Sequence, residues 1–529
     1  MDTDVLVVGA GPTGLMLANQ LVRRGISVLI IDRHAGPSLE TRALGVQART
    51  LEIYSQLGIA DRALELGKRG TGGNIWADGK HRARIALSDV GDKVTPYPFL
   101  LVLGQDDNER IMGDRLRELG GSVQWSAELV SLKQNDGSVS AVVKHADGSQ
   151  REIVASWVAG CDGARSIVRE SCGITFAGAP YEHVFFVADT EMTGKMVPEE
   201  VNVYLFRDGF HLLFPMRGKN HWRIAGILPP ALRNKPDLKF GEVIPSLQNE
   251  AGDQLAIKSC SWFSTYRIHH RAAVRFRDRR CFLLGDAAHI HSPVGAQGMN
   301  TGLQDAYNLA WKLALVIKKR ATPALLESYG QERIPVAKAL LSGTDRAFRI
   351  VVSDSWFLGL LRTKVLSRIA AFAVNRKAMQ RIAFRTVSQT GIRYPQSSLS
   401  KSLDALPETA PQAGDRFSWL RLKLNPNGPV EDLFRTLSDT HFHLVLIGQP
   451  PMTGQANRFD SLLETHVIPA DADNDKELAR AQIPQPSFYL IRPDGYIGLC
   501  GKIAQADEIA EYAEKNLQLE AQPIAKAAT

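Results

Sequence analysis

The residues best suited to chemistry at the start of the chain are glycines spaced for a phosphate-binding turn. Gly9, Gly11 and Gly14 follow a short apolar run, and Asp32 ends a second apolar run one helix length later. Such a turn lets backbone approach a pyrophosphate, and the helix that follows offers free N–H groups to the anion. An acid in the position of Asp32 accepts a hydrogen bond from a ribose. The pattern predicts a dinucleotide-binding unit rather than a purely structural turn.

A second pattern of the same kind lies far downstream. Gly285 and Asp286 end an apolar run, His289 follows closely, and a stretch from Pro293 to Asn300 is rich in small residues. This arrangement again places an acid beside a glycine at the end of an expected strand. It predicts a second turn that contributes to the same nucleotide site.

A third acid stands between these two motifs. Asp162 precedes Gly163 at the end of another apolar run. One interpretation is that Asp162 only caps the helix that follows, and the other is that it also contacts a cofactor. Both remain open. Arg165 and Arg169 are one helical turn apart, so we expect them to share a face of that helix.

The elements that must hold these motifs follow from periodicity. Residues 1–34 are typical of a β-α-β unit, 40–66 and 107–119 of helices, and 298–319 of a long helix. Alternating, aromatic residues over 180–270 indicate a mostly antiparallel sheet. The chain returns to the nucleotide domain at the second motif, so that domain is expected to be discontinuous with the sheet inserted.

The second half of the chain divides differently. Residues 324–390 are helical and basic, and we interpret the amphipathic stretch at 353–362 as core or dimer packing rather than membrane contact. Residues 395–414 are expected to form a linker. Apolar runs at His443–Ile447 and Phe488–Gly498 then predict strands of a small α/β domain.

Composition excludes several classes of protein. The 529 residues exceed one ordinary core, so two or three domains are expected. No apolar run approaches the roughly 20 residues needed to cross a bilayer, and no export signal is recognisable, so we expect a cytoplasmic protein without membrane contact. The net charge of +7 is spread among almost as many acids, which argues against nucleic-acid binding.

The cysteines exclude further chemistry. There are five, widely spaced and without a Cys-x-x-Cys pair. Neither a disulfide framework nor a zinc site fits this pattern, so no metal is expected. A flavin disulfide reductase, which needs a closely spaced dithiol, is disfavoured for the same reason.

The three motifs, in this order, resemble those of the single-component FAD-dependent aromatic hydroxylases. This family includes phenol, hydroxyphenylpropionate and polyketide hydroxylases with a p-hydroxybenzoate hydroxylase-like fold. The resemblance covers nearly the whole chain, because Arg492-Pro-Asp-Gly495 also recurs in the thioredoxin-like C-terminal domain of the larger members. It implies an α/β fold: a Rossmann-like FAD domain, an inserted antiparallel sheet domain, and a thioredoxin-like α/β domain.

The resemblance implies that the chain is divided into four parts. These are a discontinuous FAD-binding domain at 1–75, 101–179 and 272–345, a substrate-binding sheet domain at 76–100 and 180–271, a helical segment at 346–400, and a C-terminal domain at 410–529. The last part has no Cys-x-x-Cys and only one cysteine, Cys500. We therefore expect it to serve packing or dimer contact rather than redox chemistry.

Cofactor contacts carry over position by position. Asp32 would bind the adenosine ribose with Arg33 beside it, and Asp286 would bind the ribityl chain. Arg42 and Gln105 match contacts to the pyrophosphate and adenosine side, although both could be merely solvated. The implied positions are Gly9, Gly11, Pro12, Thr13, Gly14, Asp32, Arg33, Arg42, Gln105, Leu129, Asp162, Gly285, Asp286, Gly298, Met299 and Asn300.

The start of the long helix has an expected role of its own. Gly298, Met299 and Asn300 would present backbone N–H groups to the N1–C2 carbonyl region of the flavin. A helix N-terminus stabilises the negative charge that reduced flavin carries there. Ala296 stands where many members have glycine, which predicts that this position does not adopt a positive φ angle.

The resemblance also implies the reaction. NAD(P)H reduces FAD, O2 adds at carbon 4a to give a hydroperoxide, and the distal oxygen passes to an electron-rich ring. The protein must therefore hydrogen-bond or deprotonate a phenol and keep the site dry. The expected partners are a small aromatic substrate, O2 and NAD(P)H, and a homodimer is a family-based expectation.

Candidate catalytic residues come from the inserted sheet and the segment after the second motif. Tyr266 and His269 lie at the expected domain junction and suit a phenol, although each could equally be a core side chain. Pro293 matches a family proline whose carbonyl lines the pocket. Tyr204 and His211 are weaker candidates for the substrate pocket.

Three hypotheses for function remain. The first is hydroxylation of a simple phenol, and the second is the same chemistry on a polycyclic polyketide or antibiotic. Pocket volume decides between these two, and the sequence does not give it. The third is a non-catalytic, flavin-bound interaction protein.

Overall fold

The computed structural model describes residues 1–38, 43–77, 79–206, 209–251, 255–290, 296–352, 377–452 and 459–520. Within these ranges, side chains are described except at 180–182, 249–251, 268–269, 343–352, 377–378 and 460. Arg42, Pro293, the side chain of His269 and the amphipathic stretch 353–362 therefore lie outside the described residues.

A mixed sheet carries the amino-terminal glycine turn. Its main path runs through β17 (Arg277–Asp278), β18 (Cys281–Leu283), β11 (Gln150–Gly160), β1 (Thr3–Val8), β2 (Val28–Ile31) and β8 (Val123–Gln124). A hairpin of β9 (Glu128–Gln134) and β10 (Val139–Lys144) pairs antiparallel with β11. Because β2, β1, β11 and β18 are parallel neighbours, their carboxyl ends meet at one edge, where α/β sheets bind ligands.

Helices cover this sheet because its central strands are apolar on both faces. Val5, Leu6 and Val7 in β1 are fully buried, as a covered parallel strand requires. The helix α1 (Pro12–Arg23) packs against α5 (Gln105–Glu118) and α8 (Gly298–Ile317), which brings the start of the chain against a helix nearly 300 residues later.

The inserted sheet is larger than the sequence predicted. Its strands, in spatial order, are β19 (His289–Ile290), β16 (Leu255–Ala273), β12 (Phe176–Gly194), β15 (His221–Ile227), β14 (Gly209–Pro215), β13 (Val201–Phe206), β5 (Gly72–Ala77) and β6 (Lys80–Ala86). All pairs are antiparallel except β13 with β5. The strand β19 directly follows the second motif, so that motif links the two large sheets.

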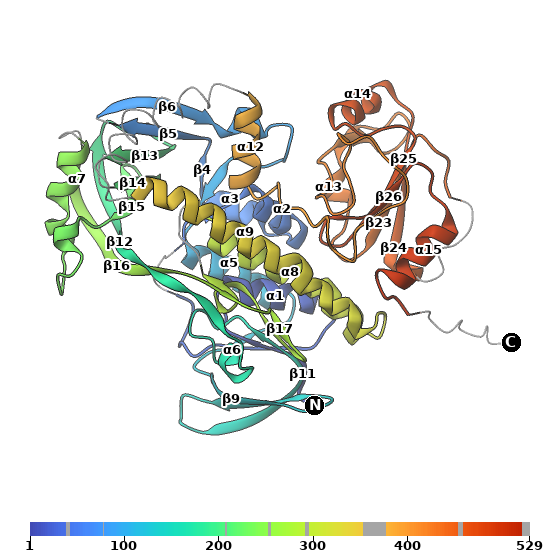
Figure 1. Cartoon of the computed structure of the whole chain (residues 1–529), viewed down its shortest axis with the longest axis horizontal. Coiled ribbons are helices and arrows are strands. Elements are labelled where there is room, and N and C mark those ends of the chain that lie inside the picture. Colours follow the sequence, from blue (N-terminus) through green and yellow to red (C-terminus); the bar gives the residue numbers. More distant parts are fainter. Residues whose placement is uncertain are drawn as a thin grey trace.

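The two faces of the inserted sheet have different neighbours. The helices η2 (Phe240–Glu242) and α7 (Ile244–Ala251) pack on the outer face, where they share a hydrophobic cluster with the sheet. The helix α9 (Glu327–Val352) contacts β14 and β16 from the other side. Figure 1 shows α7 at the left margin and α9 running toward the sheet near β14.

The helix expected over 40–66 is in fact two helices. They are α2 (Ala48–Leu57) and α3 (Ala60–Leu66), preceded by β3 (Gly45–Val46), which belongs to a small sheet with β7 (Leu100–Val102) and β4 (Lys68–Gly70). Gly58 causes the break, because it adopts φ +78° and closes α2 with a left-handed cap. The remaining short helices of this half are η1 (Pro230–Leu232), η3 (Gly285–Ala287), η4 (Pro323–Leu326), α4 (Leu87–Gly91) and α6 (Ile167–Ser171).

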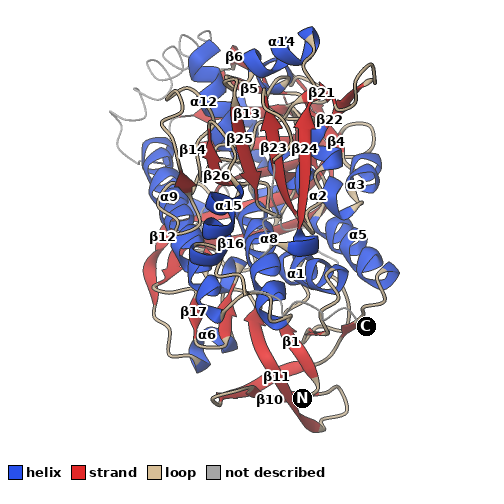
Figure 2. Cartoon of the chain, turned by 90° about the vertical axis from the view of Figure 1, so that its right-hand side faces the viewer, coloured by secondary structure: helices blue, strands red, loops and turns tan. Residues whose placement is uncertain are grey.

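The C-terminal part forms its own five-stranded sheet among the described residues. Its order is β20 (Lys401–Ser402), β26 (Ile497–Gly501), β25 (Ser487–Ile491), β23 (Phe442–Ile447) and β24 (Leu463–Ile468). Around it lie α13 (Leu433–Thr436), η6 (Asp460–Leu462), α14 (Ala472–Arg480), α15 (Ala506–Lys515) and a hairpin of β21 (Arg421–Lys423) with β22 (Val430–Asp432). The helix α12 (Lys377–Val387) packs instead against α4, beside the inserted sheet. Figure 2 shows β25, β23 and β24 side by side.

The segment 395–414 is not a free linker. The strand β20 pairs in parallel with β26, and Leu399 and Leu406 are buried. The polar composition that suggested a linker instead supplies turns that the sheet holds in place. None of the helices in the described ranges is long and apolar enough to cross a membrane.

Buried charges join the C-terminal domain to the rest of the chain. We call Lys312, Glu332, Arg492 and Asp494 the docking seam. Arg492 Nη1 lies 2.6 Å from Glu332 Oε1, and Lys312 Nζ lies 2.7 Å from Glu332 Oε2. Arg492 Nε donates to Asp494 Oδ1 at 3.0 Å, and Trp311 Nε1 donates to Asp494 Oδ2 at 3.1 Å. The four side chains are at most 1% exposed, and their charges balance.

Candidate functional site

The turn between β1 and α1 is fixed by backbone packing at two glycines. Gly9 has φ +102°, and a side chain there would overlap the carbonyl of Cys161 after β11. A side chain at Gly14 would overlap the carbonyl of Gly9. At Gly11 the situation is the opposite, because no atom lies within 4 Å of a Cβ built there. Gly9 and Gly14 permit the turn, and Gly11 faces open space.

The helix that follows this turn points an uncapped N-terminus at that open space. Gly11 is the N-cap residue and makes no side-chain cap bond, and Pro12 occupies the first helical position. First-turn N–H groups have no partner within a helix, and the helix dipole adds positive potential to them. This end of α1 is therefore suited to an anion such as a pyrophosphate.

Asp32 stands immediately after β2, beside the turn. Its Oδ2 accepts from Ala10 N at 2.7 Å, and its Oδ1 accepts from His34 N at 2.9 Å and lies 2.7 Å from His34 Nδ1. A carboxylate offers about four acceptor sites, so these bonds leave capacity for a hydroxyl. Arg33, next to it, is exposed.

A pair of side chains on α5 holds both ends of the segment around Arg42. Gln105 Oε1 accepts from Ala43 N at 3.3 Å, and Glu109 Oε2 accepts from Ser38 N at 2.9 Å. Gln105 Nε2 also donates to Glu109 Oε1 at 2.8 Å. Burial raises the pKa of Glu109. The sequence analysis singled out Gln105 and missed Glu109, although their spacing of one helical turn was visible.

The second motif meets the first in space. Gly285 has φ +57°, and a Cβ built there would stand 2.7 Å from Thr13 Oγ1 at the start of α1. A side chain at Gly302 on α8 would overlap the same hydroxyl. Asp286 is exposed in η3 at this junction. Two stretches distant in the chain therefore form one site.

A buried ion cluster that the sequence analysis missed fixes the second motif. Asp305 on α8 accepts from Gly285 N at 3.1 Å, lies 2.7 Å from His289 Nε2, and accepts from Arg333 Nε at 2.6 Å. Burial alone would raise the pKa of Asp305, but Arg333 and His289 hold it below its ordinary value. The signal was a polar stripe at Thr301, Asp305, Asn308 and Lys312 on an otherwise apolar helix.

The start of α8 is clamped by one side chain. Asn300 Oδ1 accepts from Gln47 N at 2.9 Å and from Thr50 Oγ1 at 2.7 Å. Its Nδ2 donates to Gly45 O at 2.8 Å and to Ala296 O at 2.7 Å. All four capacities of the amide are used. The backbone N–H groups of the first helical turn keep their expected orientation along the helix axis.

The expectation for Ala296 was wrong. This residue adopts φ +52°, the left-handed region that the loss of glycine was expected to disfavour. The carbonyl of Ala296 accepts from the Asn300 amide, and Gln47 and Thr50 from a distant segment hold that amide in place.

Comparison with known proteins also indicates an FAD-binding protein over most of the chain. Residues 2–344 match the family model described as an FAD binding domain. A 6-methylpretetramide 4-monooxygenase from Streptomyces rimosus is 31% identical, covering 94% of this chain and 90% of its own length. A pentachlorophenol 4-monooxygenase from Sphingobium chlorophenolicum is also 31% identical, covering 93% of this chain and 86% of its own.

A solved structure agrees with these relatives. The anhydrotetracycline hydroxylase from Streptomyces rimosus superposes with a TM-score of 0.80 at 26% identity, covering 98% of this chain and all of that one. The chain belongs to the FAD-dependent aromatic hydroxylases. It is an FAD-dependent monooxygenase, and NAD(P)H is the co-substrate typical of such enzymes.

The residues present fit the FAD of this hydroxylase family. Gly11 faces open space beside an uncapped helix N-terminus, and the turn at Gly285 abuts the same helix. A long, narrow dinucleotide with a central diphosphate requires such a path along the carboxyl edge of the sheet.

Two further positions of the hydroxylase site lie at the same edge. Asp162 follows β11, and its Oδ2 accepts from Val168 N at 3.2 Å, although Ser166 is the N-cap residue of α6. Burial raises the pKa of Asp162. Leu129 is buried in β9, where it is in register with Val143.

Arg165 and Arg169 do not share a helical face. Arg165 is exposed and precedes α6, whereas Arg169 is buried with its guanidinium 4.0 Å from the centre of the Phe176 ring. Arg169 Nη1 donates to Ala287 O at 3.1 Å. The helix α6 begins only at Ile167, because Ser166 caps it, so Arg165 lies outside the helix. Arg169 therefore supports the second motif from behind.

The candidate substrate residues separate onto two faces of the inserted sheet. Tyr266 is paired with Phe185 across β16 and β12, and their ring centres are 6.1 Å apart in the cluster with Phe210 and Ile227. Tyr204 stacks on Trp76, 5.5 Å away, in the cluster that includes α7. His211 packs against Phe186 of that same cluster. Tyr204 and His211 thus lie on one face of the sheet and Tyr266 lies on the other face.

Proposed function

We propose that this monooxygenase hydroxylates a phenolic ring held between the flavin site and the inner face of the inserted sheet. The observation that carries the proposal is the meeting of the two glycine turns at Thr13, next to a sheet that β19 joins to the second turn. When bound, FAD supplies reduction by NAD(P)H and activation of O2. The chain supplies binding, orientation and exclusion of water.

Tyr266 is the proposed hydrogen-bond partner of the substrate. Burial raises the pKa of Tyr266 to about 12. Its hydroxyl therefore stays protonated near neutral pH and acts as a donor, not as a base. The apolar neighbours Phe185, Phe210 and Ile227 exclude water around it. His269 stays a prediction from the sequence, and Pro293 stays a prediction of the resemblance.

Tyr204 and His211 are better explained as packing residues. Tyr204 donates to Lys195 O within the cluster beneath α7, and His211 packs against Phe186 of that cluster. A matched pair of variants tests this division. Tyr266→Phe should reduce the product formed per NAD(P)H consumed without changing FAD content, whereas Tyr204→Phe should leave that ratio unchanged. The reverse pattern would place the substrate on the outer face.

Asp286 is proposed to bind the ribityl chain, with Asp32 and Arg33 at the adenosine end and the N–H groups of Gly298, Met299 and Asn300 at the flavin ring. Asp286→Ala should yield largely colourless protein. Asp507→Ala, an exposed change in α15, is the control for purification losses. Unchanged flavin content in Asp286→Ala would remove the ribityl assignment.

A second candidate function keeps the chemistry and enlarges the substrate to a polycyclic polyketide. Two of the relatives support it, since they are named for 6-methylpretetramide and anhydrotetracycline. A panel of simple and polycyclic phenols, scored for stimulated NAD(P)H oxidation with product and hydrogen peroxide quantified separately, separates the two. Yellow protein that oxidises no NAD(P)H with either class would favour a non-catalytic flavin protein.

The C-terminal domain is proposed to be thioredoxin-like in outline and without redox function. Its strands β23 and β24 are parallel, β25 pairs antiparallel with β23, and β26 pairs antiparallel with β25 before the last helix. Cys500 is buried, and burial raises the pKa of its thiol. We retain the domain limits given above as a proposal. The homodimer and the cytoplasmic location stay predictions.

A further inference from the structure

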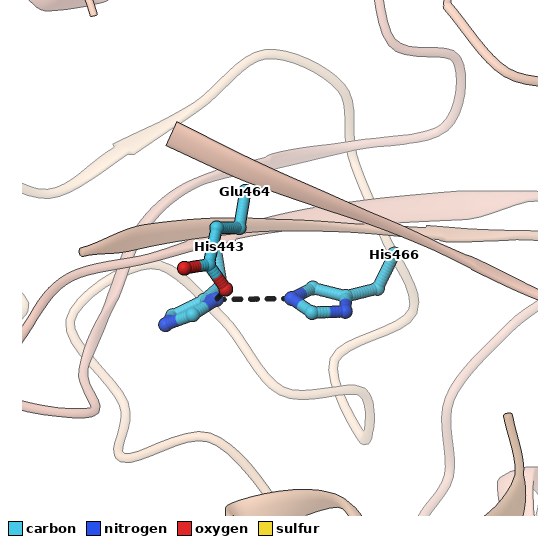
Figure 3. A group of neighbouring side chains, drawn as sticks. All are labelled: His443, Glu464 and His466. Carbon is cyan, nitrogen blue, oxygen red and sulfur yellow. Dashed lines mark hydrogen bonds and ion pairs between the residues drawn. The ribbon is translucent and has the colours of Figure 1, made fainter. Parts of the chain in front are cut away.

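Three side chains with metal-binding atoms converge on the edge of the C-terminal sheet. His443 in β23 is in parallel register with Glu464 in β24, and His466 follows Glu464 by two residues. Alternate residues of a strand point to the same face, so all three side chains emerge on one side of the sheet. Figure 3 shows them turned toward one another.

The distances are those of a preformed cluster. His443 Nδ1 lies 2.9 Å from His466 Nε2 and 3.5 Å from Glu464 Oε2. One ligand atom from each residue lies within 4.8 Å of the other two. A tetrahedral zinc ion with Zn–N bonds of roughly 2.0–2.1 Å holds neighbouring ligand atoms about 3.3 Å apart. The two distances from His443 Nδ1 therefore lie within about 0.4 Å of this value.

The tautomer of His443 is fixed by the backbone. Its Nε2 lies 2.7 Å from the carbonyl of Ser438, and a carbonyl only accepts, so this nitrogen carries the proton. The Nδ1 lone pair is thus directed into the cluster. Metal-binding histidines usually donate their second ring N–H to a carbonyl in this way.

A hydrogen bond alone satisfies only part of this arrangement. His466 Nε2 can donate to the lone pair of His443 Nδ1, but the carboxylate of Glu464 then faces that same electron-rich nitrogen at 3.5 Å. Two acceptors so close repel each other unless a cation stands between them. His441 adds a third imidazole, with Nδ1 3.3 Å from Glu464 Oε1.

We propose that His443, Glu464 and His466 bind a divalent transition-metal ion, with zinc the best match to two imidazoles and one carboxylate. This donor set suits zinc better than calcium or magnesium, which prefer oxygen ligands. The fourth position faces solvent, because the Glu464 side chain is 43% exposed while that of His443 is 1% exposed. The ion would fasten the edge strand β24 to β23 and so stiffen the C-terminal domain.

This site is separate from the flavin chemistry. Its ligands belong to the C-terminal sheet, whereas the nucleotide turns follow β1 and β18. The sequence analysis expected no metal because it relied on cysteine spacing, and the ligands here are histidines on different strands. Loss of the metal should therefore leave flavin content and NAD(P)H oxidation unchanged.

The experiment uses the full-length, flavin-loaded chain. After treatment with a chelator and desalting, the protein is titrated with Zn2+ by calorimetry, and bound zinc is measured by elemental analysis after dialysis. We expect about one zinc ion per chain and a higher melting temperature with zinc, because a ligand that binds only the folded state stabilises it. No retained zinc would overturn the proposal.

Variants distinguish a built site from surface histidines. Glu464→Gln and His466→Ala should each abolish stoichiometric binding, whereas His145→Ala in the turn between β10 and β11 should not. Co2+ in the parent protein should give the intense visible absorption of a tetrahedral site, and His466→Ala should lose it. Equal zinc binding in all three variants would show adventitious binding and overturn the proposal. Flavin content serves as the folding control for each variant.

Discussion

The nucleotide turn and the docking seam are both buried junctions between distant parts of the chain, but they are built from opposite materials. At the turn, Gly9 and Gly14 remove side chains so that backbone can pass within contact distance. At the seam, Glu332 and Arg492 bring full charges into the interior and neutralise them by pairing. The turn depends on the absence of side chains, and the seam depends on buried side chains of opposite charge that pair with each other.

The two junctions should therefore fail in different ways. A side chain added at the turn displaces backbone, and nothing nearby can yield, because the obstructing atoms are carbonyls. A side chain removed at the seam leaves its partner charged and buried, which costs more than the pair contributed. Damage at the turn should therefore appear as weaker flavin binding, and damage at the seam should appear as a lower free energy of unfolding.

The largest expected effect is at the turn. Gly14→Val should give colourless or insoluble protein, because the new side chain overlaps the Gly9 carbonyl. Gly11→Ala is the matched variant: no atom lies within 4 Å of its Cβ, and φ is −70°. It should fold with an unchanged melting temperature but bind FAD more weakly, as measured by flavin titration of the apoprotein. Tight FAD binding in Gly11→Ala would mean that the pyrophosphate does not pass there.

At the seam, Arg492→Met should destabilise the protein by about 3–5 kcal/mol while keeping FAD. The variant leaves Lys312 to balance two buried carboxylates, Glu332 and Asp494. Thermal unfolding and limited proteolysis measure the effect, with release of the C-terminal domain as the expected proteolytic product. Arg421→Met, an exposed change in the same domain, should stay within about 0.5 kcal/mol. Loss of FAD in Arg492→Met would show that the two junctions are coupled.

Acid should weaken the seam. Burial would raise the pKa of Glu332, but Arg492 and Lys312 hold it below the ordinary 4.5. A carboxyl with a lowered pKa in the folded state stabilises fully above its unfolded pKa, and this stability is lost as the pH falls below about 4.5. Glu332→Gln should be less stable at neutral pH and show a shallower decline in acid. Denaturant unfolding from pH 7 to pH 3 checks both slopes.

The smallest effect is expected at the strained residue beside the turn. Ala296→Gly relieves a positive φ, which costs an alanine roughly 1–2 kcal/mol, but glycine loses about 0.5–1 kcal/mol more chain entropy on folding. The net gain should stay within about 1 kcal/mol. Gly45→Ala should destabilise the protein, because its Cβ would stand 2.6 Å from that of Ala296. Combining the two changes should recover part of the loss, as thermal unfolding would show.

The features that could be predicted from the sequence are those that leave a local pattern in it. The β-α-β unit, the long helix near 298–317 and the antiparallel sheet were recognisable because each leaves a local pattern. The glycine turns were recognisable because backbone constraints are written in consecutive residues. Gly58 already interrupted the apolar spacing of residues 40–66 in the sequence. The left-handed Ala296 was missed, because the Asn300 amide that contacts it is itself held by a distant segment.

The nucleotide-binding family of this protein is encoded in its glycine spacing, since that spacing dictates which turns a backbone can make whatever surrounds them. Which charged side chains meet is settled by the packing of the folded chain. Asp305 with Arg333, Glu332 with Arg492, and His443 with His466 belong to segments whose separation in the chain carries no periodic signal. Long-range pairing depends on how whole elements pack, so these contacts become visible only in the folded chain.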